Sequence, residues 1–279
     1  MKFTKMEGAG NDYVYIDCFR EKVRNPEKLA GRISNRHFGV GSDGLILIQP
    51  SSKADARMVM FNPDGSRSEM CGNGIRCVAK YVYDHGIAKK KTLDIETDAG
   101  VKRLKLFIAK GVVDRVRVDM GEPQLDRAKI PMKGPPGRVV NEQLTVLGRA
   151  FNVTAVNMGN PHCVAFIDDV DGFDLAKYGP AVERHPSFPR RTNAEFVEVT
   201  DRRHLKMRVW ERGTGETLAC GSGACAVCVA ASLNGLAERK VSVRLPGGVL
   251  AIEWRASDHR VLKTGPAREV FEGEWTGRE

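Results

Sequence analysis

The same short pattern occurs twice in this chain, and each copy holds a cysteine in a glycine-rich turn. The copies read Met70-Cys71-Gly72-Asn73-Gly74 and Ala219-Cys220-Gly221-Ser222-Gly223. The offset of 149 residues between the two cysteines also relates further pairs: Met58 and Met207, Phe61 and Trp210, Asn11 and Asn160, Gly86 and Gly235. We therefore predict two copies of one structural unit, related by a pseudo-twofold axis, each supplying a cysteine to one place.

The length and the charge of the chain narrow its class. A chain of 279 residues suits two domains. No segment approaches the about 20 apolar residues of a membrane span, and the first residues lack the apolar stretch of a signal peptide, so we expect a cytoplasmic protein. The net charge of +9 is dispersed and not interleaved with aromatic residues, which favours a solvated basic surface over nucleic-acid binding.

Short strands and two helices make up the predicted elements. Apolar or alternating runs indicate strands at 14–17, 45–48, 58–61, 104–108, 112–119, 241–245 and 249–254. One helix begins after each cysteine, and Gly86 and Gly235 can end them. The second helix is apolar or small on almost every side, so protein must surround it. We predict an α+β fold of two pseudo-repeated domains, each a barrel-like, mostly antiparallel sheet around a central helix.

Turns that follow strands place the domain boundaries. We expect an N-terminal half at 1–119 that contains Cys71, and a C-terminal half at 120–263 that contains Cys220. The last strand, within 264–279, is expected to return to the N-terminal half.

A cysteine at the start of a helix lies near free backbone N–H groups and the positive end of the helix dipole, which favours the thiolate. The glycines around Cys71 and Cys220 let a substrate carboxylate approach that backbone. One thiolate could then remove a Cα proton while the other thiol returns a proton to the opposite face. This predicts inversion of an α-amino or α-hydroxy acid without a cofactor.

The cysteines also have interpretations that do not involve catalysis of proton transfer. Cys71 and Cys220 could be buried thiols or a redox pair, although their equivalent places in a repeat favour catalysis. Cys225 and Cys228 have a C-x-x-C spacing inside the apolar helix, which indicates core packing rather than a metal site. The odd count of seven cysteines indicates free thiols in a reducing compartment.

Six motifs together resemble the diaminopimelate epimerase family, nearly from end to end of the chain. They are Lys5-Met6-Glu7-Gly8-Ala9-Gly10-Asn11-Asp12-Tyr13, Phe61-Asn62-Pro63-Asp64-Gly65-Ser66, Cys71-Gly72-Asn73-Gly74-Ile75-Arg76-Cys77, Asn157-Met158-Gly159-Asn160-Pro161-His162-Cys163, Glu211-Arg212-Gly213 and Ala219-Cys220-Gly221-Ser222-Gly223-Ala224-Cys225. The resemblance implies cofactor-independent interconversion of LL- and meso-2,6-diaminoheptanedioate, a step toward lysine and peptidoglycan precursors. It also implies two similar barrel-like domains with the site in the cleft between them, and it makes a homodimer plausible.

The resemblance further implies roles for individual residues. Cys71 matches the proton donor and Cys220 the acceptor for one direction, with the roles exchanged in the other. The backbone of Gly72-Asn73 and of Gly221-Ser222 would hold the reacting carboxylate. His162 and Glu211 would adjust the two thiols. The distal amino acid end would be held by these residues: Asn11, Asn62, Asn160, Asn193, Glu211 and Arg212.

The sequence departs from the family pattern, and alternatives stay open. Many members carry a substrate-contacting glutamine where this chain has Gly44, and some carry a tyrosine at a dimer contact near Phe271. A proline or hydroxyproline racemase-type epimerase of the same architecture is the alternative enzyme. It has one charged end to bind, whereas Asn62, Asn193 and Arg212 suit a second zwitterionic end.

Overall fold

The computed structural model describes residues 1–277 and divides the chain into two compact units. The first half comprises Met1–Val118 and the chain from Thr264 onward, and the second half comprises Asp119–Lys263. No helix in the described part of the chain has the length and apolar character that crossing a membrane requires.

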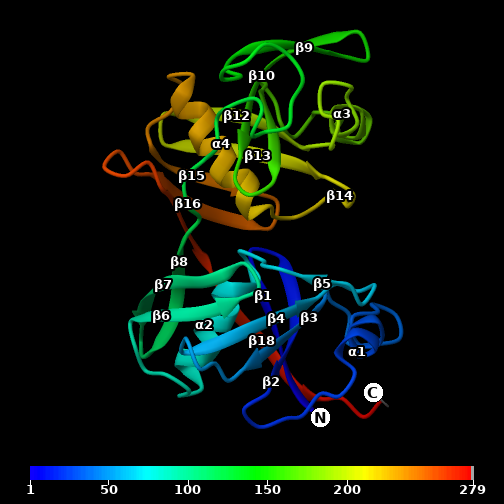
Figure 1. Cartoon of the computed structure of the whole chain (residues 1–279), viewed down its shortest axis with the longest axis vertical. Helices are drawn as coiled ribbons and strands as arrows, with labels where there is room; N and C mark the ends of the chain where they lie inside the picture. Colours follow the sequence, from blue (N-terminus) through cyan, green and yellow to red (C-terminus); the bar gives the residue numbers. More distant parts are fainter. Residues whose placement is uncertain (278–279) are drawn as a thin grey trace. The chain divides into compact units, whose positions relative to one another are not determined.

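The first half is a curved sheet with two helices (Figure 1). Its elements are β1 (Lys2–Gly8), β2 (Asn11–Asp17), α1 (Pro26–Ile33), β3 (Leu45–Gln49), β4 (Ala56–Phe61), β5 (Arg67–Ser68), α2 (Gly74–Asp84), β6 (Thr92–Thr97), β7 (Gly100–Ala109), β8 (Val112–Asp119) and β18 (Arg268–Glu274). From β1 the neighbours alternate: β1–β2 antiparallel, β2–β3 parallel, β3–β4 antiparallel, β4–β6 parallel and β6–β7 antiparallel. The returning strand β18 pairs with β1.

The second half repeats this topology element by element. Its elements are β9 (Glu142–Val146), β10 (Arg149–Asn157), β11 (Pro161–Phe166), α3 (Leu175–Glu183), β12 (Asn193–Asp201), β13 (His204–Glu211), β14 (Gly215–Glu216), α4 (Gly221–Leu233), β15 (Lys240–Leu245) and β16 (Gly248–Trp254), with β17 (Val261–Pro266) leading out of the unit. The pairings β10–β11, β11–β12, β12–β13, β13–β15 and β15–β16 alternate antiparallel and parallel as in the first half. Both parallel pairs need a crossover, and a helix lies in each crossover.

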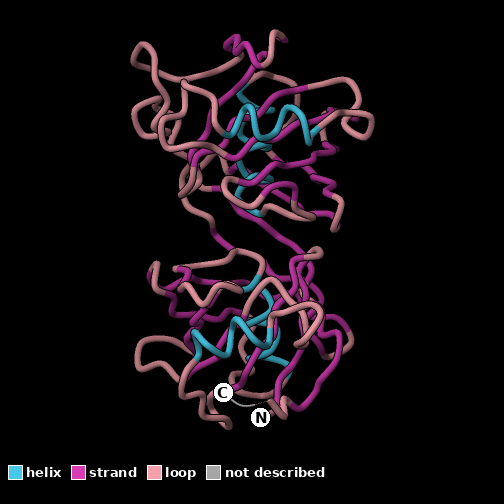
Figure 2. Tube along the Cα trace, turned by 90° about the vertical axis from the view of Figure 1, so that its right-hand side faces the viewer, coloured by secondary structure: helices cyan, strands magenta, loops and turns pink. Residues whose placement is uncertain are grey.

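A central helix lies on the concave side of each curved sheet: Figure 1 labels these helices α2 and α4, and Figure 2 shows helices enclosed by strands within each unit. The helix α4 packs against β10, β11, β12, β15 and β16, and almost all of its residues are buried. The left-handed backbone of Gly86 (φ 77°) and Gly235 (φ 68°) follows each helix end, where glycine adopts this conformation without strain. The predicted fold class is thus confirmed, including the repeat.

Alternation along the strands sorts side chains between the two helices of each half. In β3, Leu45 and Leu47 join the core beneath α1, so the neighbouring Ile46 faces α2. In β12, Ala194 and Phe196 join the core that α3 covers, so Glu195 faces α4. This alternation places a carboxyl beneath the start of the second central helix.

Candidate active site

The first half holds the Cys71 thiol in the turn that leads into α2. The thiol donates to Asn11 Oδ1 at 3.4 Å, and its sulfur accepts the Gly74 backbone N–H at 3.3 Å. Cys71 is half-buried, and Asn73 occupies the helix N-cap. The structure therefore brings together Cys71 and Asn11, two of the predicted site residues, from distant parts of the sequence.

The buried guanidinium of Arg76 holds the turn around Cys71 by hydrogen bonds. Arg76 is fully buried and donates to the carbonyl of Gly72 at 3.1 Å and to Asn73 Oδ1 at 2.8 Å. Its Nε donates to the carbonyl of Pro266 at 3.0 Å, which ties the C-terminal segment to the same turn. Burial lowers the pKa of Arg76.

The second half holds the Cys220 thiol at the N-cap of α4, where it is only 3% exposed. Its sulfur lies 3.6 Å from the Ser222 hydroxyl. Burial raises the pKa of Cys220 well above that of an ordinary thiol, and the carboxyls of Glu211 and Glu195 add to the shift. Our expectation that the helix start favours the thiolate is therefore wrong for Cys220, because burial outweighs the hydrogen bonds from Ser222 and Gly223.

His162 is fully buried, and the sequence analysis identified only one of its two hydrogen-bond partners. Its Nδ1 lies 2.6 Å from Glu195 Oε1, and its Nε2 lies 2.9 Å from Asn160 Oδ1. Burial raises the pKa of Glu195, and the contact with His162 opposes that shift. We did not predict Glu195. The available signal was a charged residue with an apolar neighbour on each side, Ala194 and Phe196.

A hydrogen bond joins the start of β12, at Asn193, to Arg212, which directly follows β13. The Asn193 amide donates to the carbonyl of Pro161 at 2.8 Å and accepts the backbone N–H of Arg212 at 2.9 Å. Glu211 accepts a hydrogen bond from the hydroxyl of Thr217. The sequence analysis did not predict Thr217. The Arg212 side chain is exposed and donates from Nη1 to the carbonyl of Arg190 at 3.2 Å. Asn193 thus acts on Arg212 through its backbone.

Asn62 and Gly44 lie in loops of the first half. Asn62 donates to the Ser66 hydroxyl at 2.9 Å, and among the described residues no hydrogen bond joins it to Cys71. A Cβ at Gly44 would lie 2.3 Å from the carbonyl of Phe61 and 2.9 Å from the Tyr13 ring. Because Gly44 also has a φ of 154°, no glutamine fits its place in this chain.

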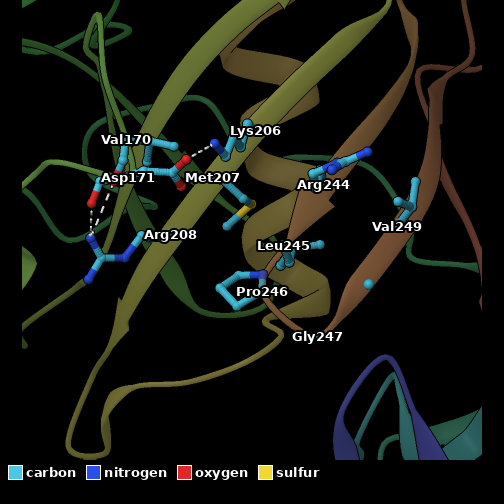
Figure 3. Close-up of a pocket in the computed structure, with 11 residues that line it drawn as sticks. Val170, Asp171, Lys206, Met207, Arg208, Arg244, Leu245, Pro246, Gly247 and Val249 are labelled. Carbon is cyan, nitrogen blue, oxygen red and sulfur yellow. Dashed lines mark hydrogen bonds and ion pairs between the residues drawn. The ribbon is translucent and has the colours of Figure 1, made fainter.

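A cavity of about 470 Å³ opens elsewhere in the second half (Figure 3). It lies where β13 and β15 diverge, and none of the predicted site residues lines it. Its basic side chains are partly engaged: Lys206 pairs with Asp171, and Arg208 donates to the carbonyls of Val170 and Phe173. Among the described residues, no group of His, Cys, Asp or Glu side chains could hold a metal ion.

Solved structures define the class of fold. The chain is similar to a Bacillus anthracis phenazine biosynthesis protein of the PhzF family, with a TM-score of 0.72 and 16% identity over 98% of each chain. It is also similar to a probable proline racemase from Agrobacterium radiobacter, with a TM-score of 0.71 and 14% identity over 99% of this chain and 92% of that chain. At such identities the likeness shows the fold alone.

Sequence comparisons identify the family. The model of diaminopimelate epimerase matches residues 3–125 and 154–270. Diaminopimelate epimerase of Acetivibrio thermocellus is 57% identical over 274 residues, which is 98% of each chain. That of Pelotomaculum thermopropionicum is 55% identical over 281 residues, with full coverage of both chains. The chain belongs to the diaminopimelate epimerase family and is an enzyme of the epimerase class, as the motifs predicted.

Proposed function

We propose that this enzyme interconverts LL- and meso-2,6-diaminoheptanedioate by moving a proton at one Cα, without a cofactor. The observation that carries the proposal is the pair of thiols, Cys71 and Cys220, each at a glycine-rich helix start in an equivalent place of the repeat. Family membership at 57% identity over nearly the whole chain supports the substrate.

In the proposed reaction, one thiolate takes the Cα proton, so that the C–H bond breaks and an S–H bond forms. The other thiol gives its proton to the opposite face of the carbanion, which inverts the centre and leaves that sulfur as the new thiolate. Backbone N–H groups of Gly72-Asn73 and Gly221-Ser222 would hold the carboxylate, because free N–H groups at helix starts stabilise developing negative charge. The reverse reaction exchanges the two sulfurs.

The distal amino acid end would be held by polar side chains from both halves: Asn11, Asn62, Asn160, Asn193, Glu211 and Arg212. Arg212 supports this assignment best, because its exposed guanidinium can present a fork to a carboxylate. Asn193 holds the backbone of Arg212 and so fixes where the side chain begins. A proline or hydroxyproline substrate has no distal carboxylate for Arg212 to bind.

His162 and Glu211 would adjust the thiols. Glu211 does so by charge, because its carboxyl contributes to the raised pKa of Cys220. The Thr217 hydroxyl holds Glu211 in position, and Asn160 holds His162.

The proposal extends to the compartment, the pathway and the oligomeric state of the enzyme. We propose a cytoplasmic, PLP-independent enzyme of lysine and peptidoglycan precursor biosynthesis that acts as a homodimer. Val270 and Phe271 on β18 support the dimer, because both are large apolar side chains and are exposed by 57% and 48%. Neither a nucleic acid nor a membrane is a proposed partner.

An isotope experiment tests the reaction. LL-diaminoheptanedioate is incubated with the enzyme in heavy water under strong reductant, with free proline as the rival substrate. We expect early meso product that carries deuterium at the inverted Cα, while unreacted substrate stays largely unlabelled and proline is not inverted. Transfer of the original proton into product would contradict the two-thiol mechanism, and loss of activity under reductant would indicate a redox role.

A further inference from the structure

Glu195 is a carboxyl that is fully buried in the second half and that the proposed reaction does not use. It reaches the α4 face of β12 because Ala194 and Phe196 point to the opposite face, into the core that α3 covers. A buried carboxyl requires a specific compensation, since taking its charge out of water is costly. Its surroundings therefore indicate what it does.

The carboxyl lies between His162 and the Cys220 turn. Its Oε1 is 2.6 Å from His162 Nδ1. A Cβ placed on Gly223 would lie 2.8 Å from Glu195 Oε1 and 3.3 Å from Cys220 Sγ, so the carboxyl and the thiol flank the same point of the backbone. The other carboxyl oxygen, Oε2, is buried without a hydrogen-bond partner among the described residues.

The hydrogen bonds of His162 determine how many protons the His162–Glu195 pair holds. Asn160 Oδ1 is an acceptor, so His162 Nε2 carries a proton. The short contact between His162 Nδ1 and Glu195 Oε1 needs a second proton, on either partner. The pair thus holds two protons, as imidazolium and carboxylate or as imidazole and carboxylic acid, and is neutral overall.

Two carboxyls among the described residues act on the Cys220 thiol, after burial itself, and they lie on neighbouring strands. Glu211 on β13 and Glu195 on β12 oppose a charge on Cys220, and Glu195 opposes one on Cys163 as well. In the first half, the position 149 residues before Glu195 is Ile46, whose Cδ1 lies 2.6 Å from a Cβ placed on Gly74. A methyl group therefore occupies the place in the first half that the carboxyl occupies in the second.

We propose that Glu195 is a positioning residue of the second half: it holds His162 through Nδ1 and keeps the Cys220 sulfur in its thiol form in the free protein. This rests on the proposed function and deepens it, because a Cys220 that is a thiol when substrate binds acts as the acid in that direction of the reaction. Glu195 itself does not touch the reacting carbon in this assignment.

The test follows alkylation of each cysteine by iodoacetamide from pH 6 to 10, with peptide mass spectrometry to separate Cys220 from Cys71. Glu195→Gln keeps the shape of the side chain but cannot hold a proton of the pair. A His162 ring that donates both to Asn160 and to the glutamine carbonyl then carries a positive charge that no carboxylate balances, and this charge favours the thiolate of Cys220. We expect the Cys220 profile to move to lower pH by about one unit, which gives about tenfold faster alkylation at neutral pH. The Cys71 profile of the same protein should not move.

Two further variants keep the outcome decisive. Glu198→Gln, on the same strand but only partly buried, should leave the Cys220 profile unchanged. Glu195→Ile copies the first half and leaves His162 as a neutral ring with its proton on Nε2, so it should shift the profile less than Glu195→Gln does. Folded variants with an unmoved Cys220 profile would overturn the proposal, as would an equal shift for Glu198→Gln. Because alkylation uses no substrate, the inference can fail while epimerisation is observed, and the reverse.

Discussion

The two halves share one scaffold and surround their thiols with different chemistry. Cys71 donates to an asparagine, and the position that corresponds to Cys225 in the second half is a buried guanidinium, Arg76. Cys220 lies near two carboxyls, Glu195 and Glu211, and is itself fully enclosed. The same backbone thus presents one thiol near a buried cation and the other near two carboxyls, of which Glu195 is fully buried.

The matched positions show how few side chains create this difference. Tyr13 lies 149 residues before His162, and burial raises the pKa of its hydroxyl, so Tyr13 stays neutral where the second half has an imidazole. A reaction that moves a proton from one face of a carbon to the other needs an acid and a base at the same moment. A duplicated fold supplies two thiols, and unequal surroundings can assign them unequal roles.

The largest effect we expect is the loss of either thiol. Cys71→Ala and Cys220→Ala should each lower the epimerisation rate at least about a hundredfold, because each removes one of the two proton-transfer groups. Cys225→Ala, one turn further along α4, is the control and should keep its activity. Substantial activity in one of the two thiol variants would mean that only one half does chemistry.

The buried cation should matter for stability in the first half alone. Arg76→Met leaves the carbonyls of Gly72 and Pro266 and the Asn73 side chain without their donor. We expect the free energy of unfolding to fall by about 3 kcal/mol, against about 1 kcal/mol for Cys225→Ala at the corresponding position. Urea unfolding measures both, and equal losses would show that the guanidinium is not a structural tie.

The glycines under the two thiols should respond differently to a methyl group. In Gly223→Ala the new Cβ would lie 2.8 Å from Glu195 Oε1, which His162 holds in place. In Gly74→Ala it would meet the Ile46 Cδ1, a methyl that can rotate away. We expect about a tenfold loss of kcat for Gly223→Ala and a smaller loss for Gly74→Ala. The reverse order in steady-state rates would contradict the tighter second site.

The smallest effect concerns the core thiols, where the halves should behave alike. Burial raises the pKa of Cys77 to about 11 and that of Cys228 to about 12. These thiols stay protonated in the folded state while the unfolded chain ionises, so stability is complete below an ordinary thiol pKa and falls as pH rises above it. Each of these two thiols should lower the free energy of unfolding at pH 9 by about 0.8 kcal/mol.

The measurement for these thiols is the change in unfolding free energy between pH 7 and pH 9. Cys77→Ala and Cys228→Ala should each make this change in unfolding free energy smaller, and by a similar amount. An unchanged slope in both variants would mean that these thiols ionise equally readily in both states.

Much of the fold followed from patterns that are local in the chain. The offset of 149 residues predicted the repeat, because two copies of one fold must place equivalent residues at a constant distance. The apolar character of 224–233 predicted a helix enclosed by protein, since a helix without a polar face has no side for water. The motifs around Cys71 and Cys220 predicted the family.

Tertiary structure alone decided the electrostatics of the site. The sequence places Cys220 at a helix start and so suggests a thiolate, but the solvent exposure of a thiol depends on every element packed around it, and burial reverses the direction. Glu195 was missed for the same reason, because it lies 33 positions from His162 in the chain and the two meet only through the parallel pairing of β11 and β12. Local propensity depends on neighbours in the chain, whereas the charge state of a buried group depends on neighbours in space.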